Sequence, residues 1–469
     1  MKSFGNIAKD GQVRAVASGA LTDGKAVIVN SDGTVSVVAG SAQAIGTPVV
    51  FETGSTNYTA TTFDSNLNKI VIAYQDLANS NYGTAVVGTV SGVSISFGTP
   101  VVFESARAEY ISATFDSNAN KAVIAYADNG DSAKGTAIVG TVSGTSISFG
   151  SPTVFDSDYL EHGSCTFDTN SNKVVMAYKV DLGGGTKYGR SVVGTVSGTS
   201  ISFGSPVIFE NADSIYISTT FDSSNNKVVI AYRDQGNSNY GTAIVGTVSG
   251  TSISFGSASV FESGSSGYIS ITFDSNANKV VIAYQDGSNS SYGTAVVGTV
   301  SGTSISFGTP QVFNSTSTFY TSATFDTNQN KALISFSNAN STGDIAPATV
   351  SGTSLTFDSF VTFESAQTEW ISSTFDTNQN SFVAAYRDGG NSDRGTGNAV
   401  QVGSTNITSE NFIGFSDGAF ANTDSAAINT TNTIDRNQSG LTAGQTYFVQ
   451  TDGTLGLTAA DPSVTAGTA

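Results

Sequence analysis

The chain has 469 residues, a formal net charge of −18 and a sequence pI near 4.2. This acidity argues against nucleic-acid partners, whose phosphates need Lys and Arg, and against anionic membrane surfaces. A single cysteine, Cys165, excludes an intrachain disulfide, and no stretch is long and apolar enough to predict membrane insertion. Met1–Ala15 has no apolar segment of the kind found in signal peptides, so a cleaved leader is not expected.

The two ends of the chain share a short pattern. A Gly-rich turn, a Val-rich strand and an Asp-Gly hairpin occur over 19–35, and the same order returns over 440–455. Neither end is long enough to bury a core by itself. We therefore expect residues 1–40 and 411–469 to form one small β domain, into which the central region is inserted.

The central region is a repeat built around a Phe-Asp-Ser/Thr-Asn-x-Asn-Lys stretch. Successive Phe-Asp pairs are 52, 52, 54, 52, 52 and 50 residues apart. The pairs begin at Phe63, Phe115, Phe167, Phe221, Phe273, Phe325 and Phe375. Self-similarity at about 50 residues is typical of propellers, solenoids and repeat arrays.

Each repeat predicts four short strands. In the fifth repeat these are 268–274, 279–286, 294–300 and 304–313, and Pro310 marks the last as an edge or bulged strand. No helical periodicity is present, so the prediction for 41–410 is an all-β, seven-bladed β-propeller with four-stranded blades. A β-solenoid is the alternative. The seventh repeat lacks a fourth strand, and residues 39–52 match that strand, which predicts a last blade closed by an N-terminal strand.

Strand direction separates the two faces of the predicted disc. Turns after the first and third strands share a face with the two flanks and barely change between repeats, whereas loops after the second and fourth strands vary. Variable loops on a rigid scaffold are common places for binding sites, with neutral drift as the alternative. The candidate ligand-binding residues on this variable face are Tyr58, Arg107, Tyr110, Tyr159, Tyr216, Tyr268, Tyr320, Trp370 and Arg387.

Two series of carboxylates also recur. One ends the fourth strand (Glu52, Glu104, Asp156, Glu210, Glu262, Glu364) and one ends the second (Asp76, Asp128, Asp234, Asp286, Asp388, with Asp181 one place late); Asn314 and Asn338 replace them at the sixth repeat. The two series either share a cation such as calcium or accept loop N–H bonds, and we favour the second.

Other candidate chemistry is weak. Asp274-x-Asn276-x-Asn278 begins like a calcium loop but lacks its later Gly and Glu, so an Asx-turn is the preferred interpretation. We therefore expect no cofactor and no metal site, with calcium as the open alternative. His162, the only histidine, is expected to be exposed, and Cys165 to be a packed small residue. Near-equivalent carboxylates in six repeats look structural, so we do not expect an enzyme.

The flanks resemble virion proteins of marine bacteriophages. The similarity rests on 441–455 and on Asp461-Pro462-Ser463-Val464-Thr465-Ala466-Gly467-Thr468-Ala469, and the Ala-Tyr-Arg/Gln-Asp and Tyr-Gly-Thr-Ala repeat motifs are also similar. The resemblance implies a fibre, tail or capsid-decoration protein on the virion surface, bound to other virion proteins through its terminal β domain. A host receptor or surface glycan is the expected ligand, and a homo-oligomer is possible for such proteins. The alternatives are a passive decoration subunit without a ligand and a surface-glycan hydrolase.

Overall fold

The computed structural model describes residues 11–41, 43–407, 410–430, 438–459 and 463–469. It divides into two compact units, 1–44 with 402–469 and 45–401. The first ten residues of the expected small domain, and Asp461-Pro462 of the virion-like stretch, lie outside the described residues. No helix in the described ranges is long and apolar enough to cross a membrane.

The terminal unit joins both ends of the chain in one sheet. Its strand order is β1-β37-β36-β2-β3, so the two C-terminal strands lie side by side between strands of the N-terminal segment. Val27, Ile28, Phe415 and Ile428 are buried in its two apolar clusters. The strands of this unit are β1 (Gln12–Val16), β2 (Ala26–Val29), β3 (Val35–Val37), β4 (Gly40–Ser41), β35 (Ser404–Thr405), β36 (Phe412–Ser416), β37 (Ser425–Thr430), β38 (Thr446–Val449), β39 (Leu455–Gly456) and β40 (Thr465–Thr468).

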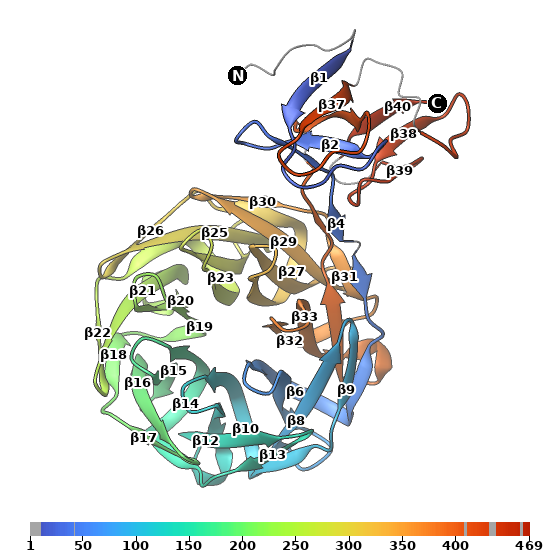
Figure 1. The fold of residues 1–469 in the computed structure, drawn as a ribbon. Coiled ribbons are helices and arrows are strands. Elements are labelled where there is room, and N and C mark those ends of the chain that lie inside the picture. The colour runs from blue at the N-terminus through green and yellow to red at the C-terminus, as the bar shows by residue number, and fades with distance from the viewer. Residues whose placement is uncertain (1–10, 42, 408–409, 431–437, 460–462) are drawn as a thin grey trace. The chain divides into compact units, whose positions relative to one another are not determined.

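Residues 45–401 form a β-propeller, which confirms the predicted all-β fold class; its sheets are arranged around a central axis (Figure 1). The second strand of every repeat is enclosed on both faces, and Val280, Ile282 and Tyr284 of β24 have no exposed surface. These second strands are β7 (Lys69–Asp76), β11 (Lys121–Asp128), β15 (Lys173–Asp181), β20 (Lys227–Asp234), β24 (Lys279–Asp286), β28 (Lys331–Asn338) and β33 (Ser381–Asp388).

The third strand pairs with the second and carries the Tyr-Gly-Thr-Ala motif. Its glycine is required by packing, because a Cβ at Gly293 would lie 2.5 Å from the Phe313 ring. The third strands are β8 (Tyr82–Ser91), β12 (Lys134–Ser143), β16 (Lys187–Ser197), β21 (Tyr240–Ser249), β25 (Tyr292–Ser301), β29 (Gly343–Ser351) and β34 (Arg394–Gln401). Three 3₁₀ turns, η1 (Asn129–Asp131), η2 (Gln235–Asn237) and η3 (Gly389–Asn391), follow second strands.

The fourth strand is split in two, which corrects the expectation of one strand over 304–313. Its first half pairs with the end of the third strand, and its second half, after Gly308-Thr309-Pro310, pairs with the start. Proline has no N–H for the ladder, so the break falls there. The first halves are β9 (Ser94–Phe97), β13 (Ser146–Phe149), β17 (Ser200–Phe203), β22 (Ser252–Phe255), β26 (Ser304–Phe307) and β30 (Ser354–Phe357), and β5 (Ala44–Ile45) lies beside β34.

Most of the expected loops after the fourth strand are not loops. In five places the second half of the fourth strand continues without a break into the first strand of the next repeat, because residues such as Thr56 and Asn57 already pair with the neighbouring second strand. These continuous strands are β6 (Val49–Asp64), β10 (Val101–Asp116), β14 (Thr153–Asp168), β23 (Ser259–Asp274) and β27 (Gln311–Asp326). Two interrupted examples are β18 (Val207–Glu210) with β19 (Ser214–Asp222), and β31 (Val361–Glu364) with β32 (Thr368–Asp376).

The start of β6 pairs with β34, so Gly395 faces Glu52 and Gly397 faces Val49.

The recurring Phe-Asp turn is an Asx-turn, as expected: Asp274 Oδ1 accepts the N–H groups of Asn276 at 2.9 Å and Ala277 at 2.8 Å. Asn278 ends this turn with a φ of 55°, in the left-handed region that asparagine tolerates better than most residues. The recurring Phe-Asp-Ser/Thr-Asn-x-Asn-Lys stretch therefore forms the hairpin turn between the first and second strands of each repeat.

Neighbouring repeats are joined by a buried tyrosine and a carboxylate. The hydroxyl of Tyr284, on the second strand of the fifth repeat, donates to Glu262 Oε2 at 3.0 Å on the preceding fourth strand. Equivalent pairs are Tyr74–Glu52, Tyr126–Glu104, Tyr178–Asp156, Tyr232–Glu210 and Tyr386–Glu364. At the remaining junction Phe336 has no hydroxyl, and Asn314 there donates to Thr318 Oγ1 at 2.8 Å instead. The loss of tyrosine and carboxylate together explains why Asn314 departs from its series.

Tyr284→Phe should lower stability by about 1–2 kcal/mol, because Oε2 of the partly buried Glu262 carboxylate loses its donor. Tyr284→Phe with Glu262→Asn, which copies the natural Phe336–Asn314 pair, should recover part of that loss. Thermal and denaturant unfolding midpoints of the two single variants and the double variant measure the coupling. Additive effects of the two substitutions would contradict the role assigned to this pair.

Candidate functional site: an aromatic collar

A β-bulge interrupts the first strand of every repeat. In β6 the register passes from Asn57↔Gln75 to Ala60↔Ala73, so Tyr58 and Thr59 together face Tyr74. The same shift occurs between Gly267 and Ser270 of β23 and in the other first strands. The first bulged residue is never glycine, yet its φ lies between 46° and 51° in all seven repeats. Such a bulge re-aims a side chain that an ordinary strand would send elsewhere.

The seven re-aimed side chains are aromatic and contact one another in a closed circle, which we call the aromatic collar. Neighbouring ring centroids are 4.5–5.8 Å apart, and the ring planes are tilted. The members, in order around the circle, are Tyr58, Tyr110, His162, Tyr216, Tyr268, Tyr320 and Trp370. Tilted and edge-to-face pairs at these distances are the favourable geometry for aromatic side chains.

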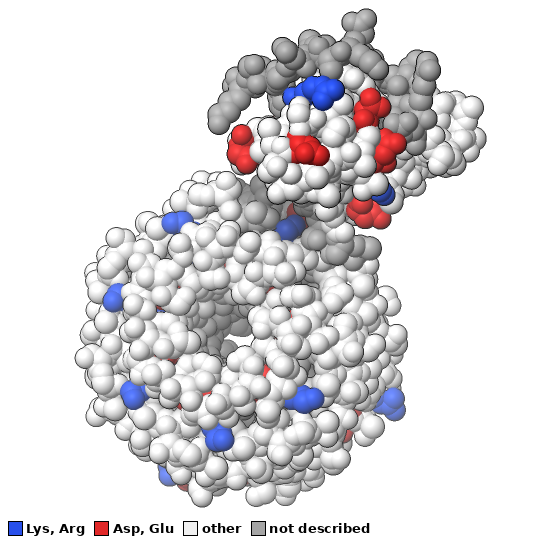
Figure 2. Space-filling view, viewed as in Figure 1, with Lys and Arg blue, Asp and Glu red and all other residues white. Residues whose placement is uncertain are grey.

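The collar surrounds a cavity of about 420 Å³, which is within the size range of small-ligand sites. The residue after each collar member also lines it, and four of these are isoleucines: Ile111, Ile217, Ile269 and Ile371. The space-filling view shows the hollow at the centre of the ring and a face on which most residues are uncharged (Figure 2).

Serine hydroxyls hold the strands together next to the collar. Ser372 Oγ accepts the N–H of Thr61 at 2.9 Å, and Ser270 Oγ accepts that of Ala323 at 2.9 Å, in each case from the next repeat. The Thr59 and Thr321 hydroxyls donate to the backbone carbonyls of Trp370 and Tyr268. Side chains of one repeat thus fix the backbone of its neighbour, and this positions the collar.

Six of the nine predicted binding residues belong to the collar: Tyr58, Tyr110, Tyr216, Tyr268, Tyr320 and Trp370. The other three lie outside it. Arg107 is exposed and paired with Glu109 at 2.5 Å, Tyr159 is 42% exposed, and Arg387 is held by Glu369 at 3.4 Å and Asp393 at 2.8 Å. The structure therefore brings six of the seven aromatic candidates together and leaves Tyr159 and the two arginines outside the collar.

His162 corrects the prediction of an exposed side chain. It is partly buried in the collar, with its ring centroid 5.1 Å from that of Tyr110 and 5.8 Å from that of Tyr216. Burial lowers its pKa to about 4, with the positive charge of Lys179 acting in the same direction. The imidazole is thus neutral at neutral pH. Its alignment with the tyrosines, five residues before each Phe-Asp pair, was the signal in the sequence that identifies it.

The hydroxyls of Tyr58 and Tyr320 in the collar remain protonated. Burial raises the pKa of Tyr58 to about 12, and the nearby Glu109 carboxylate adds to the effect. Burial, together with Glu369, raises the pKa of Tyr320 to about 12 as well. These groups can therefore donate hydrogen bonds to a ligand at any physiological pH.

The carboxylates around the collar are neutralised by cations. Glu109 pairs with Arg107, Glu161 with Lys179 at 2.6 Å, and Glu369 with Arg387. The Arg233 guanidinium carbon lies 5.4 Å from the centroid of the Tyr216 ring. The collar therefore offers aromatic faces and hydroxyl donors, and the three carboxylates named here are each balanced by a cation.

The second carboxylate series supports loops, as favoured from the sequence. Asp76 Oδ1 accepts the N–H groups of Ala78 at 3.0 Å and Asn79 at 3.1 Å, and Asp286 does the same for Ser288 and Asn289. In the part of the chain that the structure describes, no group of three or more His, Cys, Asp or Glu side chains could hold a metal ion.

Cys165 is buried, 3.3 Å from Ser112 Oγ, and burial raises its pKa to about 12, so it is the packed small residue expected.

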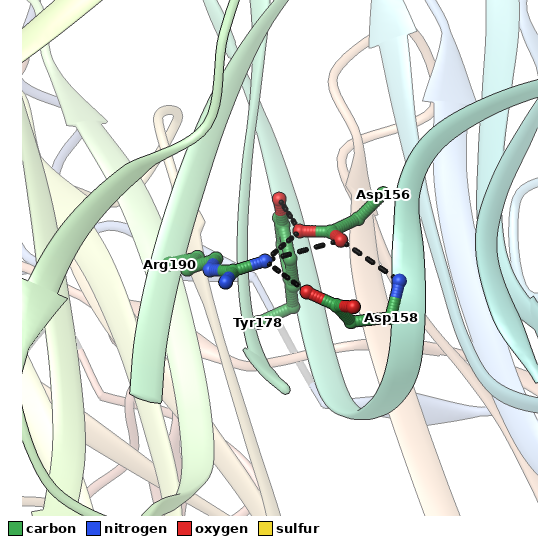
Figure 3. Close-up of polar contacts among 4 residues, drawn as sticks. All are labelled: Asp156, Asp158, Tyr178 and Arg190. Carbon is green, nitrogen blue, oxygen red and sulfur yellow. Dashed lines mark hydrogen bonds and ion pairs between the residues drawn. The ribbon is translucent and has the colours of Figure 1, made fainter. Parts of the chain in front are cut away.

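The third repeat modifies the tyrosine–carboxylate pair (Figure 3). Asp156 is one methylene shorter than the glutamates elsewhere, and Arg190 stands where five other repeats have threonine and the sixth has Asp344. Arg190 Nη1 lies 2.9 Å from Asp156 Oδ2 and 2.7 Å from Asp158 Oδ2, while the Tyr178 hydroxyl still donates to Asp156 at 2.9 Å. The arginine satisfies two carboxylates that would otherwise repel each other.

Comparison with solved structures shows the fold. The BP39L lectin of Burkholderia pseudomallei is similar with a TM-score of 0.56 at 11% identity, over 76% of this chain and 99% of that one. The Aleuria aurantia lectin in complex with Fucα1-6GlcNAc is similar at 0.44 and 12%, over 67% and 98%, and a triple mutant of AofleA from Arthrobotrys oligospora at 0.44 and 8%, over 85% and 94%. No protein-family model and no curated protein matches the sequence.

Acidification should destabilise the wild type through His162. Its folded pKa of about 4 lies below the unfolded value of about 6.5, so the unfolded state binds the proton first and stability is lost as pH falls between them. His162→Tyr, which copies the collar's commonest residue, should remove about 2 kcal/mol of this loss. Unfolding midpoints at pH 7 and pH 4.5 test it; equal acid sensitivity in both proteins would contradict a buried neutral imidazole.

The left-handed backbone of the collar predicts an unusual order of stabilities at Tyr268. Both Tyr268→Ala and Tyr268→Gly remove the ring, but alanine keeps the Cβ that makes positive φ costly. The glycine variant should therefore be the more stable of the two by about 1 kcal/mol. At Ile269, the next residue, which has no positive φ, the order should be reversed. Thermal unfolding of the four variants makes the comparison.

Proposed function

We propose that this protein is a glycan-binding attachment protein of a bacteriophage, displayed on the virion surface. The observation that carries the binding activity is the collar: seven bulges in a costly backbone conformation all aim aromatic rings at one cavity. Backbone strain that recurs at one place supports a functional role for that place. A purely structural strand has no need of a left-handed aromatic residue.

A sugar is the ligand class that fits this cavity best. One face of a pyranose is apolar and packs on aromatic rings, while its hydroxyls need hydrogen-bond partners, which the protonated tyrosines supply. The neutral His162 and the ion-paired carboxylates favour an uncharged ligand. The likeness in fold to a protein described as a lectin, at a TM-score of 0.56, agrees with this proposal.

The virion location rests on the flanks. Their likeness to marine phage virion proteins supports a mounting role for the terminal unit, with other virion proteins as its partners. Both chain segments contribute strands to its main sheet, so the unit can hold the propeller by two connections at 44–45 and 401–402. In this arrangement the collar serves attachment to a host-surface glycan.

Trp370→Ala and Tyr110→Ala should each weaken glycan binding by about ten-fold or more, because central aromatic residues dominate such interfaces. Tyr159→Ala, an exposed tyrosine outside the collar, is the matched control and should bind normally. A glycan array with the intact protein identifies the ligand, and titration of the variants measures the loss. Absence of binding to every glycan, or loss in the control alone, would contradict the proposal and favour a passive decoration subunit.

A further inference from the structure

A second cavity of about 310 Å³ adjoins the collar at the sixth repeat. Tyr268 and Tyr320 line both cavities, so the two spaces meet at these rings. The second cavity is also lined by Phe319, Ser337, Gln367 and Glu369. We call this cavity the notch.

The notch exists because Ser337 is short. Five other repeats have a long polar side chain at this position that reaches the next repeat: Gln75 Nε2 donates to Ala108 O at 2.8 Å, and Gln285 Nε2 donates to Thr318 O at 2.7 Å. Lys179, Arg233 and Arg387 likewise contact Asp213, Ser265 and Asn57 of the following repeats. In the sixth repeat the corresponding carbonyl belongs to Thr368, and the serine hydroxymethyl group cannot span the distance.

The second repeat shows that a small residue at this position does not by itself leave an opening. Ala127 stands there, but Leu160 replaces the Thr, Ser or Ala of other repeats on the facing strand. Ala127 and Leu160 are buried together in one apolar cluster. The sixth repeat has no such compensation, because the facing residue is Thr368.

A shortened loop opens the notch further. Four residues separate Asn338 from Gly343, whereas six separate Asp286 from Gly293 in the fifth repeat. The shorter loop has hydrogen bonds of its own: Asn338 Oδ1 accepts the N–H of Asn340 at 2.7 Å, and its amide donates to Thr342 Oγ1 at 2.7 Å. The opening is thus part of the fold.

The walls of the notch differ in chemistry. On one side the Phe319 and Tyr268 rings meet edge to face at 5.8 Å and 84°. On the other, Gln367 Nε2 donates to Glu369 Oε1 at 2.7 Å, and Glu369 Oε2 faces Arg387. An apolar wall opposite amide and carboxylate oxygens matches the two faces of a sugar, and the ion pair of Glu369 with Arg387 makes a neutral sugar the better fit.

We propose that the notch is a second subsite, which binds the next neutral sugar of an oligosaccharide whose terminal sugar occupies the collar. This inference rests on the proposed function and adds the ligand class: a neutral oligosaccharide of at least two residues, not a single sugar. In this proposal the oligosaccharide runs from the collar into the notch past Tyr268 and Tyr320, which line both cavities.

The test refills the notch with a side chain that the fold already uses. Ser337→Gln copies Gln285, and its amide can reach Thr368 O as Gln285 reaches Thr318 O. Ser337→Ala is the matched control, because it changes the same position but leaves the notch open. Trp370, the only tryptophan and a collar member, reports occupancy of the collar through its fluorescence.

Titrations use neutral monosaccharides and the neutral di- and trisaccharides that end in them. The wild type should bind the longer ligands about ten-fold more tightly than the terminal monosaccharide. Ser337→Gln should lose that advantage but keep its monosaccharide affinity, and Ser337→Ala should behave as wild type. Phe319→Ala, which removes the apolar wall, should lose the same advantage, so the test survives a folding failure in either notch variant.

The outcomes separate the two proposals. If Trp370 responds to sugars but Ser337→Gln and Phe319→Ala retain the preference for longer ligands, the notch is not a subsite and the collar site stands. Equal affinity of the wild type for mono- and oligosaccharides overturns the notch in the same way. If no neutral saccharide changes the fluorescence or binds the intact protein, the glycan-binding function itself is overturned, and the notch with it.

Discussion

The left-handed bulge in each first strand is the constraint on which the central site depends. A non-glycine residue in this conformation costs on the order of 1–2 kcal/mol. The conformation persists because it is fixed from both sides: the strand pairs normally before and after the bulge, and the next repeat bonds to the backbone beside it. Aromatic contacts of about 0.5–1.5 kcal/mol per pair offset part of the cost, and each ring has two neighbours. The seven positions are consequently coupled.

The tyrosine–carboxylate bonds explain how this geometry is transmitted between repeats. Tyr284 packs against Phe261 at 5.2 Å and donates to Glu262 on the same strand, so packing and hydrogen bonding act at one junction. The junction at Phe336 keeps the aromatic packing, 5.1 Å from Phe313, without the hydroxyl bond. Packing is thus the common element, and the hydroxyl bond makes each polar junction specific. In the third repeat an ion pair between Arg190 and Asp156 is added to the tyrosine–carboxylate bond, so the junction between repeats accommodates more than one set of polar side chains.

Comparison of the repeats within the sequence was sufficient to predict the propeller, because period and hairpin chemistry are local properties. Phe-Asp-Ser-Asn-x-Asn-Lys contains its own hydrogen-bond acceptor at Asp274 and its own left-handed residue at Asn278. The collar was harder to predict. The aligned tyrosines were visible, but an unbulged strand gives no reason for Tyr58 or His162 to turn toward the axis. The bulge is a property of how two strands pair, and this register cannot be read from one repeat.

Sequence differences between the repeats can make the collar selective for one ligand orientation, which a symmetric collar cannot be. Seven similar strands would produce seven similar surroundings, and an asymmetric sugar would then bind in several equivalent orientations with little selectivity. His162 breaks this equivalence on one side, and the opening at Ser337 breaks it on another. Both changes lie next to collar rings, whereas the Phe-Asp turns remain nearly uniform. A selective collar therefore requires a regular scaffold in which only one or two repeats differ beside the rings. In this chain the differences at His162 and Ser337 lie beside the collar, and the Phe-Asp turns of the scaffold are nearly the same in every repeat.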